Sequence, residues 1–221
     1  MKNIVLVVCL LVFSLKGYSQ QAEFENELGE ENVKILNSLL EDFETNTLKK
    51  EYPNVTLENA YKEFLQTIVE ENYSILEKSK ARFKDDDFKL HIYCIPDSTW
   101  IEKRQLSSGK KGFLIKERYK YLTTNNTIGY TKSTIFCCNN KDKTLELLKK
   151  ERVQINLSGL YIKALKKISN KSEFIKNYLH NIQITADPIH PHTMSNYILM
   201  NNIDVNDYFV KRILFVNTVY R

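Results

Sequence analysis

KDDDFKLHIYCIPD, residues 84–97, marks the point where the sequence pattern changes from helical to extended. After the polar turn KDDD, two sets of residues alternate along the chain: Phe88, Leu90, Ile92 and Cys94 against Lys89, His91, Tyr93 and Ile95. A period of two is typical of a strand with one buried face. We therefore predict that a strand begins near Phe88 and that the chain divides here into regions of different secondary structure.

Two further extended segments follow this strand. The first places hydrophobic and basic residues in alternation: Phe113, Ile115, Tyr119 and Tyr121 against Lys116, Arg118 and Lys120. The second is TIGYTKSTIFCC, residues 127–138, after the turn sequence TTNNT. Together they predict a small antiparallel meander from about residue 88 to 138. Such a sheet needs an apolar cover, which we expect the flanking helices to supply.

The residues before this segment carry a helical period. Apolar residues recur at steps of three and four at Phe24, Leu28, Ile35, Leu36, Leu39, Leu40 and Phe43. Pro53 ends this helix, and a second one begins near Leu57 with Thr56 or Asn54 as its N-cap. Two helices joined by a short proline turn are expected to pack antiparallel.

The last third of the chain is predicted to be helical as well. Its final helix, within residues 206–220, carries an apolar stripe and takes Asp204 as its cap. Residues 153–157, VQINL, fit either a short strand or the middle of a helix. The predicted fold class is therefore α+β and mostly α, with two N-terminal antiparallel helices, a small antiparallel meander and a helical C-terminal third.

The first residues, MKNIVLVVCLLVFSLKGYSQ, have the anatomy of a secretory signal peptide. Lys2 precedes an apolar run that is too short to span a bilayer, and small residues precede a cleavage after Ser19. We expect residues 1–19 to be removed, leaving residues 20–221 as one compact domain without a transmembrane segment. The protein is then bacterial and exported, either periplasmic or secreted.

The remaining chain is nearly balanced in charge. Removal of Lys2 and Lys16 leaves 30 Lys and Arg against 27 Asp and Glu, a net charge of +3. This balance does not favour general nucleic-acid binding. The sequence lacks a phosphate-binding GxxxxGK[ST] loop, a GxGxxG fingerprint, a GxSxG elbow and an HExxH helix. We therefore lean against an enzyme and expect no cofactor.

Three cysteines remain after cleavage: Cys94, Cys137 and Cys138. A disulfide from Cys94 to Cys137 or Cys138 would close a loop of about 43 residues and stabilise by roughly 4 kcal/mol on the chain-entropy model. The alternative is that all three are buried thiols that pack as small hydrophobic groups.

Two clusters are candidates for metal binding. In DPIHPHTM, residues 187–194, His190 and His192 flank a proline. Asp187 lies just upstream of them, and His180 is also nearby in the sequence. These residues suggest a metal-assisted hydrolase if a third ligand converges on them, and ordinary polar loop residues if none does. The run Asp85 to Asp87 suggests a hard cation or, more simply, a solvated turn.

A third feature combines basic and aromatic residues. Lys116, Arg118 and Lys120 are predicted to share the outer face of one strand, with Tyr119 and Tyr121 beside them. Such a ladder suits an anionic surface or polyanion. The alternative is an edge strand that lysines protect against aggregation.

From all these features, we expect a non-catalytic binding protein of the cell envelope or exterior, whose partner is an unknown protein or envelope ligand. The metal-assisted hydrolase and the anionic-surface binder remain alternatives.

Overall fold

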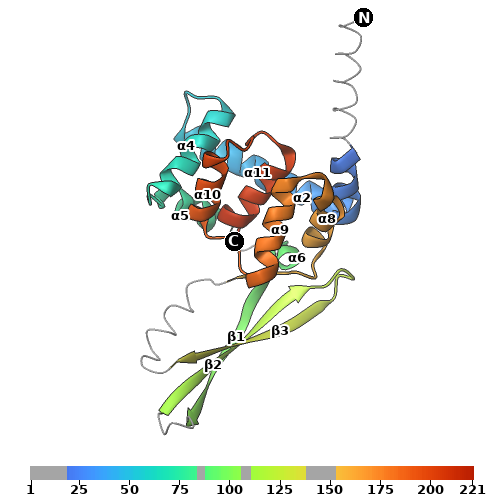
Figure 1. The fold of residues 1–221 in the computed structure, drawn as a ribbon, viewed down its shortest axis with the longest axis vertical. Coiled ribbons are helices and arrows are strands. Elements are labelled where there is room, and N and C mark those ends of the chain that lie inside the picture. The colour runs from blue at the N-terminus through green and yellow to red at the C-terminus, as the bar shows by residue number, and fades with distance from the viewer. Residues whose placement is uncertain (1–18, 84–87, 106–110, 138–152) are drawn as a thin grey trace, which may run out of the picture.

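The computed structural model describes residues 19–83, 88–105, 111–137 and 153–221. Its fold is α+β and mostly helical, as predicted: helices from both ends of the chain form one body, and three long strands extend from it (Figure 1). Several predicted features lie outside these residues, namely the leader up to residue 18, Asp85 to Asp87 and Cys138.

The N-terminal part is more divided than the sequence predicted. It comprises a helix over residues 19–28, α2 (Glu30–Phe43), the π-helical turn η1 (Glu44–Leu48), α3 (Lys49–Glu51), α4 (Leu57–Val69) and α5 (Ser74–Arg82). The predicted first helix is broken at Gly29, whose φ of +89° is a conformation that favours glycine. The N-cap of α4 is Thr56, whose hydroxyl accepts a hydrogen bond from the N–H of Asn59 at 3.3 Å.

The C-terminal third is helical, as expected. It contains α8 (Leu160–Ile168), η2 (Ser169–Lys171), α9 (Glu173–Thr185), α10 (Pro191–Met200), α11 (Tyr208–Leu214) and η3 (Phe215–Val219). The predicted cap Asp204 is wrong, because α11 begins only after Asp207. The Asp207 carboxylate accepts from the N–H groups of Phe209 and Val210 at 2.8 and 3.0 Å, whereas Asp204 accepts from Asn206 in the preceding turn.

Aromatic side chains from distant parts of the sequence build one core. The Phe43 ring lies 5.4 Å from that of Phe64 and 5.7 Å from that of Phe215, measured between centroids. Phe24 meets Phe209 edge-to-face at 5.5 Å. The first and last helices therefore depend on one another, since each buries its apolar face against the other.

The sheet begins later than predicted. Residues 89–92 form a short helix, α6 (Lys89–Ile92), because Phe88 and Ile92 both turn into the helical core instead of alternating along a strand. The strands are β1 (Tyr93–Gln105), β2 (Lys111–Leu122), β3 (Ile128–Cys137) and β4 (Gln154–Ile155). All neighbours are antiparallel in the order β3-β2-β1-β4, so residues 153–157 include a short strand.

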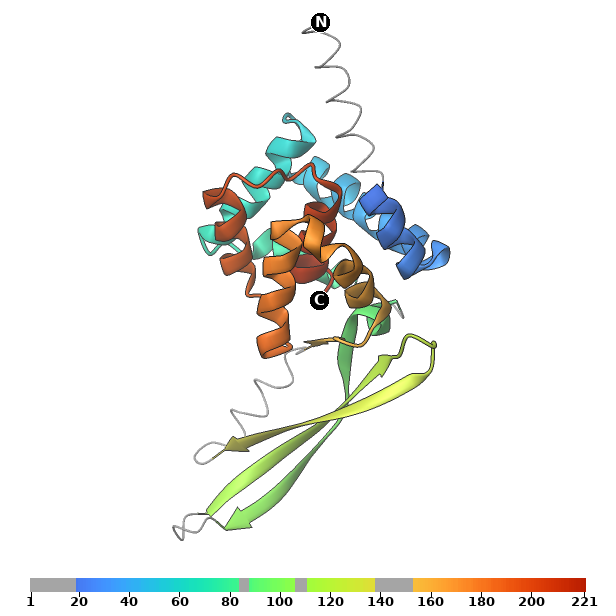
Figure 2. The same cartoon turned by 45° about the vertical axis from the view of Figure 1, so that its right-hand side comes forward.

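The three long strands extend well beyond the helices. Figures 1 and 2 both show the helical body gathered at one end of the sheet, with most of β2 and β3 beyond it. Among the described helices, α6 contacts β1 and β2, and the others pack mainly on one another, so the described helices cover only the base of the sheet. The result is a body with a projecting arm.

A small set of polar contacts fastens this arm to the body. The Asn156 side-chain amide donates to the carbonyl oxygens of Leu90, at 3.2 Å, and Leu122, at 2.7 Å. Close to it, a Cβ at Gly159 would lie 2.3 Å from the carbonyl oxygen of His91, so only glycine fits there. On the other side, the Tyr93 hydroxyl donates to the carbonyl of Val216. These contacts join the base of the sheet to both α8 and the C-terminal helices.

Candidate functional site

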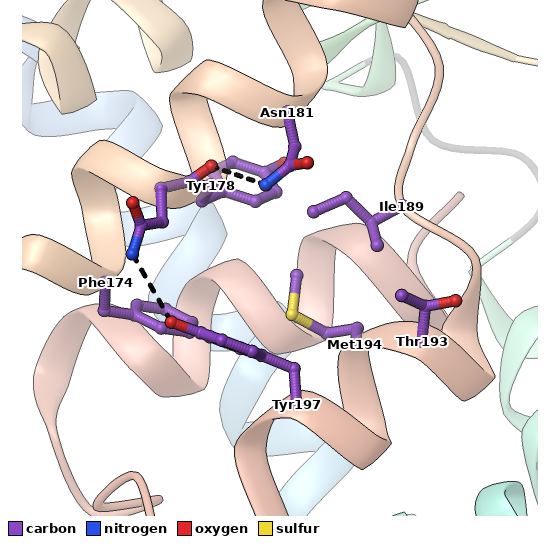
Figure 3. A pocket seen from close by; sticks show the side chains of 8 residues that line it. Phe174, Tyr178, Asn181, Ile189, Thr193, Met194 and Tyr197 are labelled. Carbon is purple, nitrogen blue, oxygen red and sulfur yellow. Dashed lines mark hydrogen bonds between the residues drawn. The ribbon is translucent and has the colours of Figure 1, made fainter. Parts of the chain in front are cut away.

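A pocket opens between the antiparallel helices α9 and α10 (Figure 3). Its volume is about 310 Å³, which is at the lower end of the range for small-molecule sites. Eight residues line it: Phe174, Asn177, Tyr178, Asn181, Ile189, Thr193, Met194 and Tyr197. None of these side chains carries a charge.

The connection between the two helices is held by one buried amide. The Asn217 side chain, which is fully buried in η3, accepts from the N–H of Ile189 and donates to its carbonyl, both at 2.8 Å. This two-point bond fixes Ile189 at one end of the pocket. The core therefore holds the backbone around the pocket in place. This reduces the entropy that is lost when a ligand binds.

Aromatic and amide groups form the other end. The rings of Phe174 and Tyr197 stack across the two helices, with centroids 6.4 Å apart and planes 18° from parallel. The Asn177 amide lies 3.5 Å from the Tyr197 hydroxyl, a long contact that can be replaced, while Asn181 donates to the Asn177 carbonyl at 2.8 Å. Figure 3 shows the stacked rings of Phe174 and Tyr197 together, with Asn181 beside Tyr178. A ligand here would meet flat apolar surface and neutral hydrogen-bonding groups.

Tyr178 and Met194 are the most buried residues of the lining. Burial raises the pKa of the Tyr178 hydroxyl well above its ordinary value, so this group stays protonated and neutral. The hydroxyl forms no hydrogen bond with any residue that the structure describes. The interior of the pocket is thus uncharged at every ordinary pH.

The histidine cluster lies close to this pocket. His190 is the N-cap of α10 and Pro191 its first residue, so His190 and His192 lie at the start of this helix. The Asp187 N–H donates a local hydrogen bond to the Thr185 hydroxyl at 3.2 Å. His180 is exposed on α9.

The described residues form no metal-binding set around these histidines. Within residues 19–83, 88–105, 111–137 and 153–221, no three His, Cys, Asp or Glu side chains converge as a metal site would require. The pKa of His190 is lowered by burial and by the nearby positive charges of Arg221, His192 and Lys80. A divalent cation would meet the same repulsion.

The disulfide predicted between Cys94 and Cys137 is not formed. Cys94 is a buried free thiol at the base of β1, paired with Gln154. Cys137 lies opposite Phe113, which in turn lies opposite Lys103, nine residues further along β1. Nine strand residues span roughly 30 Å, whereas a disulfide needs Cα atoms within about 7 Å.

The basic strand is central and not an edge, which contradicts the alternative of an edge protected by lysines. β2 pairs with β1 on one side and β3 on the other. Lys116, Arg118 and Lys120 share one face, as predicted, but Tyr119 lies on the opposite face, where it is buried and donates to Glu117 at 2.9 Å. Tyr121 shares that opposite face by alternation. The aromatic residue beside the cations is Tyr130 of β3, whose ring lies 4.9 Å from the Arg118 guanidinium.

Sequence reasoning missed the residues of the pocket. A weak signal exists, since Asn177 and Asn181 are one helix turn apart and Phe174 precedes them on the same side of α9. The contribution of Tyr197 could not be inferred without knowing that α10 folds back along α9.

A scan against protein-family models finds no match for this chain, and searches of curated proteins and of solved structures find no significant match either. In the part of the chain that the structure describes, no helix is both long enough and apolar enough to cross a bilayer.

Proposed function

We propose that this chain is a non-catalytic, exported binding protein that takes a small, uncharged, largely apolar ligand between α9 and α10. The observation that supports the proposal is the lining of the pocket, which combines a stacked aromatic pair with side-chain amides and contains no charged group. Export, to the periplasm or the exterior, rests on the leader at residues 1–19.

The size of the pocket limits the ligand. At roughly 30 Å³ for each non-hydrogen atom, a volume of about 310 Å³ holds on the order of ten such atoms. An aromatic ring system or a short alkyl chain with one hydroxyl or amide group fits this description. Ordinary ligand efficiencies then give a dissociation constant on the order of 0.1–1 mM for a probe that fills the pocket alone.

The experiment uses two neutral probes of matching size, indole and 1-octanol, detected by saturation-transfer NMR. We expect saturable binding of at least one probe to the wild-type protein. Thr193→Trp places a large side chain at the mouth of the pocket and is expected to weaken binding at least tenfold. Gln183→Trp is the matched control, because Gln183 is also exposed on this helix pair but does not line the pocket.

The two variants separate the possible outcomes. Binding that Thr193→Trp removes and Gln183→Trp preserves supports the proposal. If neither probe saturates, or if both variants bind as the wild type does, the pocket is not the ligand site and the proposal is wrong. Circular dichroism of each variant checks that the helices remain folded.

A further inference from the structure

The arm presents one face that is exposed or half-buried and carries more cations than carboxylates. The strand register and alternation place the following residues on it, and we call them the open face: Trp100, Glu102, Lys116, Arg118, Lys120, Ile128, Tyr130 and Lys132. On the opposite face Ile115, Glu117 and Tyr119 are buried. The two faces of the same strands therefore have different surroundings.

Carboxylates balance only some of the cations on the open face. The Lys116 ammonium pairs with Glu102 at 2.7 Å, and the Arg118 Nε donates to Asp97 at 2.7 Å. Lys120 and Lys132 pair with no carboxylate of the described residues. Lys132 also lies directly opposite Arg118 in the register, and like charges in this position repel each other unless an anion lies between them.

Large apolar side chains lie among these cations. Ile128 is 50% exposed and Tyr130 is 55% exposed. Leaving apolar surface of this size in water has a cost in free energy. The Arg118 guanidinium lies over the Tyr130 ring, and tyrosine combines an apolar ring with a polar hydroxyl. A surface that offers cations, an amphipathic ring and an aliphatic side chain together is suited to the interface of a lipid bilayer.

We propose that the open face docks on an anionic lipid bilayer, with Lys120 and Lys132 at the phosphates and Tyr130 and Ile128 at the boundary of the headgroups. This is independent of the pocket between α9 and α10. A bilayer explains the face better than a soluble polyanion does, because a polyanion supplies charge but no apolar environment for Ile128. The projection of the arm beyond the helical body in Figure 2 keeps most of β2 and β3 away from the helices.

The test measures co-sedimentation with vesicles of pure phosphatidylcholine and of phosphatidylcholine containing a third of phosphatidylglycerol. Binding is expected only to the anionic vesicles and is expected to fall at roughly 1 M salt, where the Debye length is about 3 Å. Trp100 is the single tryptophan of the chain and belongs to the open face, so its emission should shift to the blue when the vesicles bind.

Paired substitutions identify the face. Lys120→Gln with Lys132→Gln should weaken binding by roughly 25-fold, about fivefold for each cation. Lys166→Gln with Lys167→Gln removes the same charge from exposed positions of α8 and should leave binding nearly unchanged. Equal losses in the two pairs would show that only net charge matters and would overturn the proposal, as would equal binding to neutral and anionic vesicles.

A second comparison distinguishes a bilayer from a polyanion. Ile128→Ser should weaken vesicle binding but leave retention on heparin unchanged, while Ile184→Ser, at an exposed isoleucine of α9, should affect neither. Retention on heparin without vesicle binding, or vesicle binding that Ile128→Ser does not change, contradicts docking on a bilayer.

Discussion

Cys94 lies where β1 leaves the helical body, and its surroundings determine its chemistry. Burial raises the pKa of its thiol to about 11, because removal from water disfavours the charged thiolate. At pH 8 the thiolate is then on the order of one molecule in a thousand. A thiol in this state packs as a small hydrophobic group and reacts slowly.

We predict that Cys94 in the folded protein resists iodoacetamide at pH 8 and is alkylated at once in urea. Peptide mass spectrometry of the two samples, without reductant, is the measurement. Because the pKa is raised on folding, the contribution of this thiol to stability is complete below the unfolded pKa of roughly 8.5 and is lost as the pH rises towards 11. Recovery of a peptide pair that joins Cys94 to Cys137 would contradict the prediction.

Asn156 acts between elements, since its amide connects α6, the end of β2 and the segment that follows β4. Its side chain is almost fully buried, and both of its donors are used, by the Leu90 and Leu122 carbonyls. Removing the amide leaves the Leu90 and Leu122 carbonyls, one buried and one partly buried, without this partner, and the loss of a partner by a buried polar group costs about 1–3 kcal/mol.

Asn156→Ala is therefore expected to lower the free energy of unfolding by about 2 kcal/mol or more. The control is Asn201→Ala, because the Asn201 amide also donates to a carbonyl, that of Tyr197, but at an exposed helix end, where the expected change is within about 0.5 kcal/mol. Urea unfolding followed by circular dichroism gives both values. Equal losses in the two variants would show that Asn156 does not fasten the arm.

Element types could be predicted from the sequence because they depend on local periodicity. The stripe through Phe24, Leu36 and Phe43 and the alternation through Ile115 and Tyr119 each record which side of an element is buried. The point at which an element starts depends on distant contacts. Phe88 and Ile92 fit a strand as well as a short helix, and contact with Tyr220 and the core selects the helix.

The same distinction explains the candidate sites. Lys116, Arg118 and Lys120 share a face because alternation within one strand ensures it. The other participants come from separate elements. Tyr130 lies next to Arg118 because β3 pairs with β2 in this register, and Tyr197 lies next to Phe174 because α10 packs back along α9. The histidines of residues 187–194 were predicted together from sequence proximity, but no third ligand from the described residues joins them.

At the scale of the whole molecule, the two parts of the fold differ in what stabilises them. The helical body buries aromatic side chains from both ends of the chain, including Phe43, Phe64 and Phe215. In the arm, β2 buries Ile115 and Tyr119, whereas the side chains of residues 128–135 in β3 are exposed or half-buried and this strand is held by its hydrogen bonds with β2. Regions with few buried apolar contacts open more readily than a shared core does.

Hydrogen exchange should therefore separate the two parts. We expect backbone amides of β3 to exchange at least tenfold faster than those of α4, because β3 has one described neighbour, β2, whereas α4 buries Tyr61, Phe64 and Leu65. Mass spectrometry of peptides from residues 57–69 and 128–137 under native conditions measures both rates. If the two segments exchange at the same rate, body and arm open as one cooperative unit, and the base of the sheet around Asn156 couples them more strongly than the separation in Figure 2 suggests.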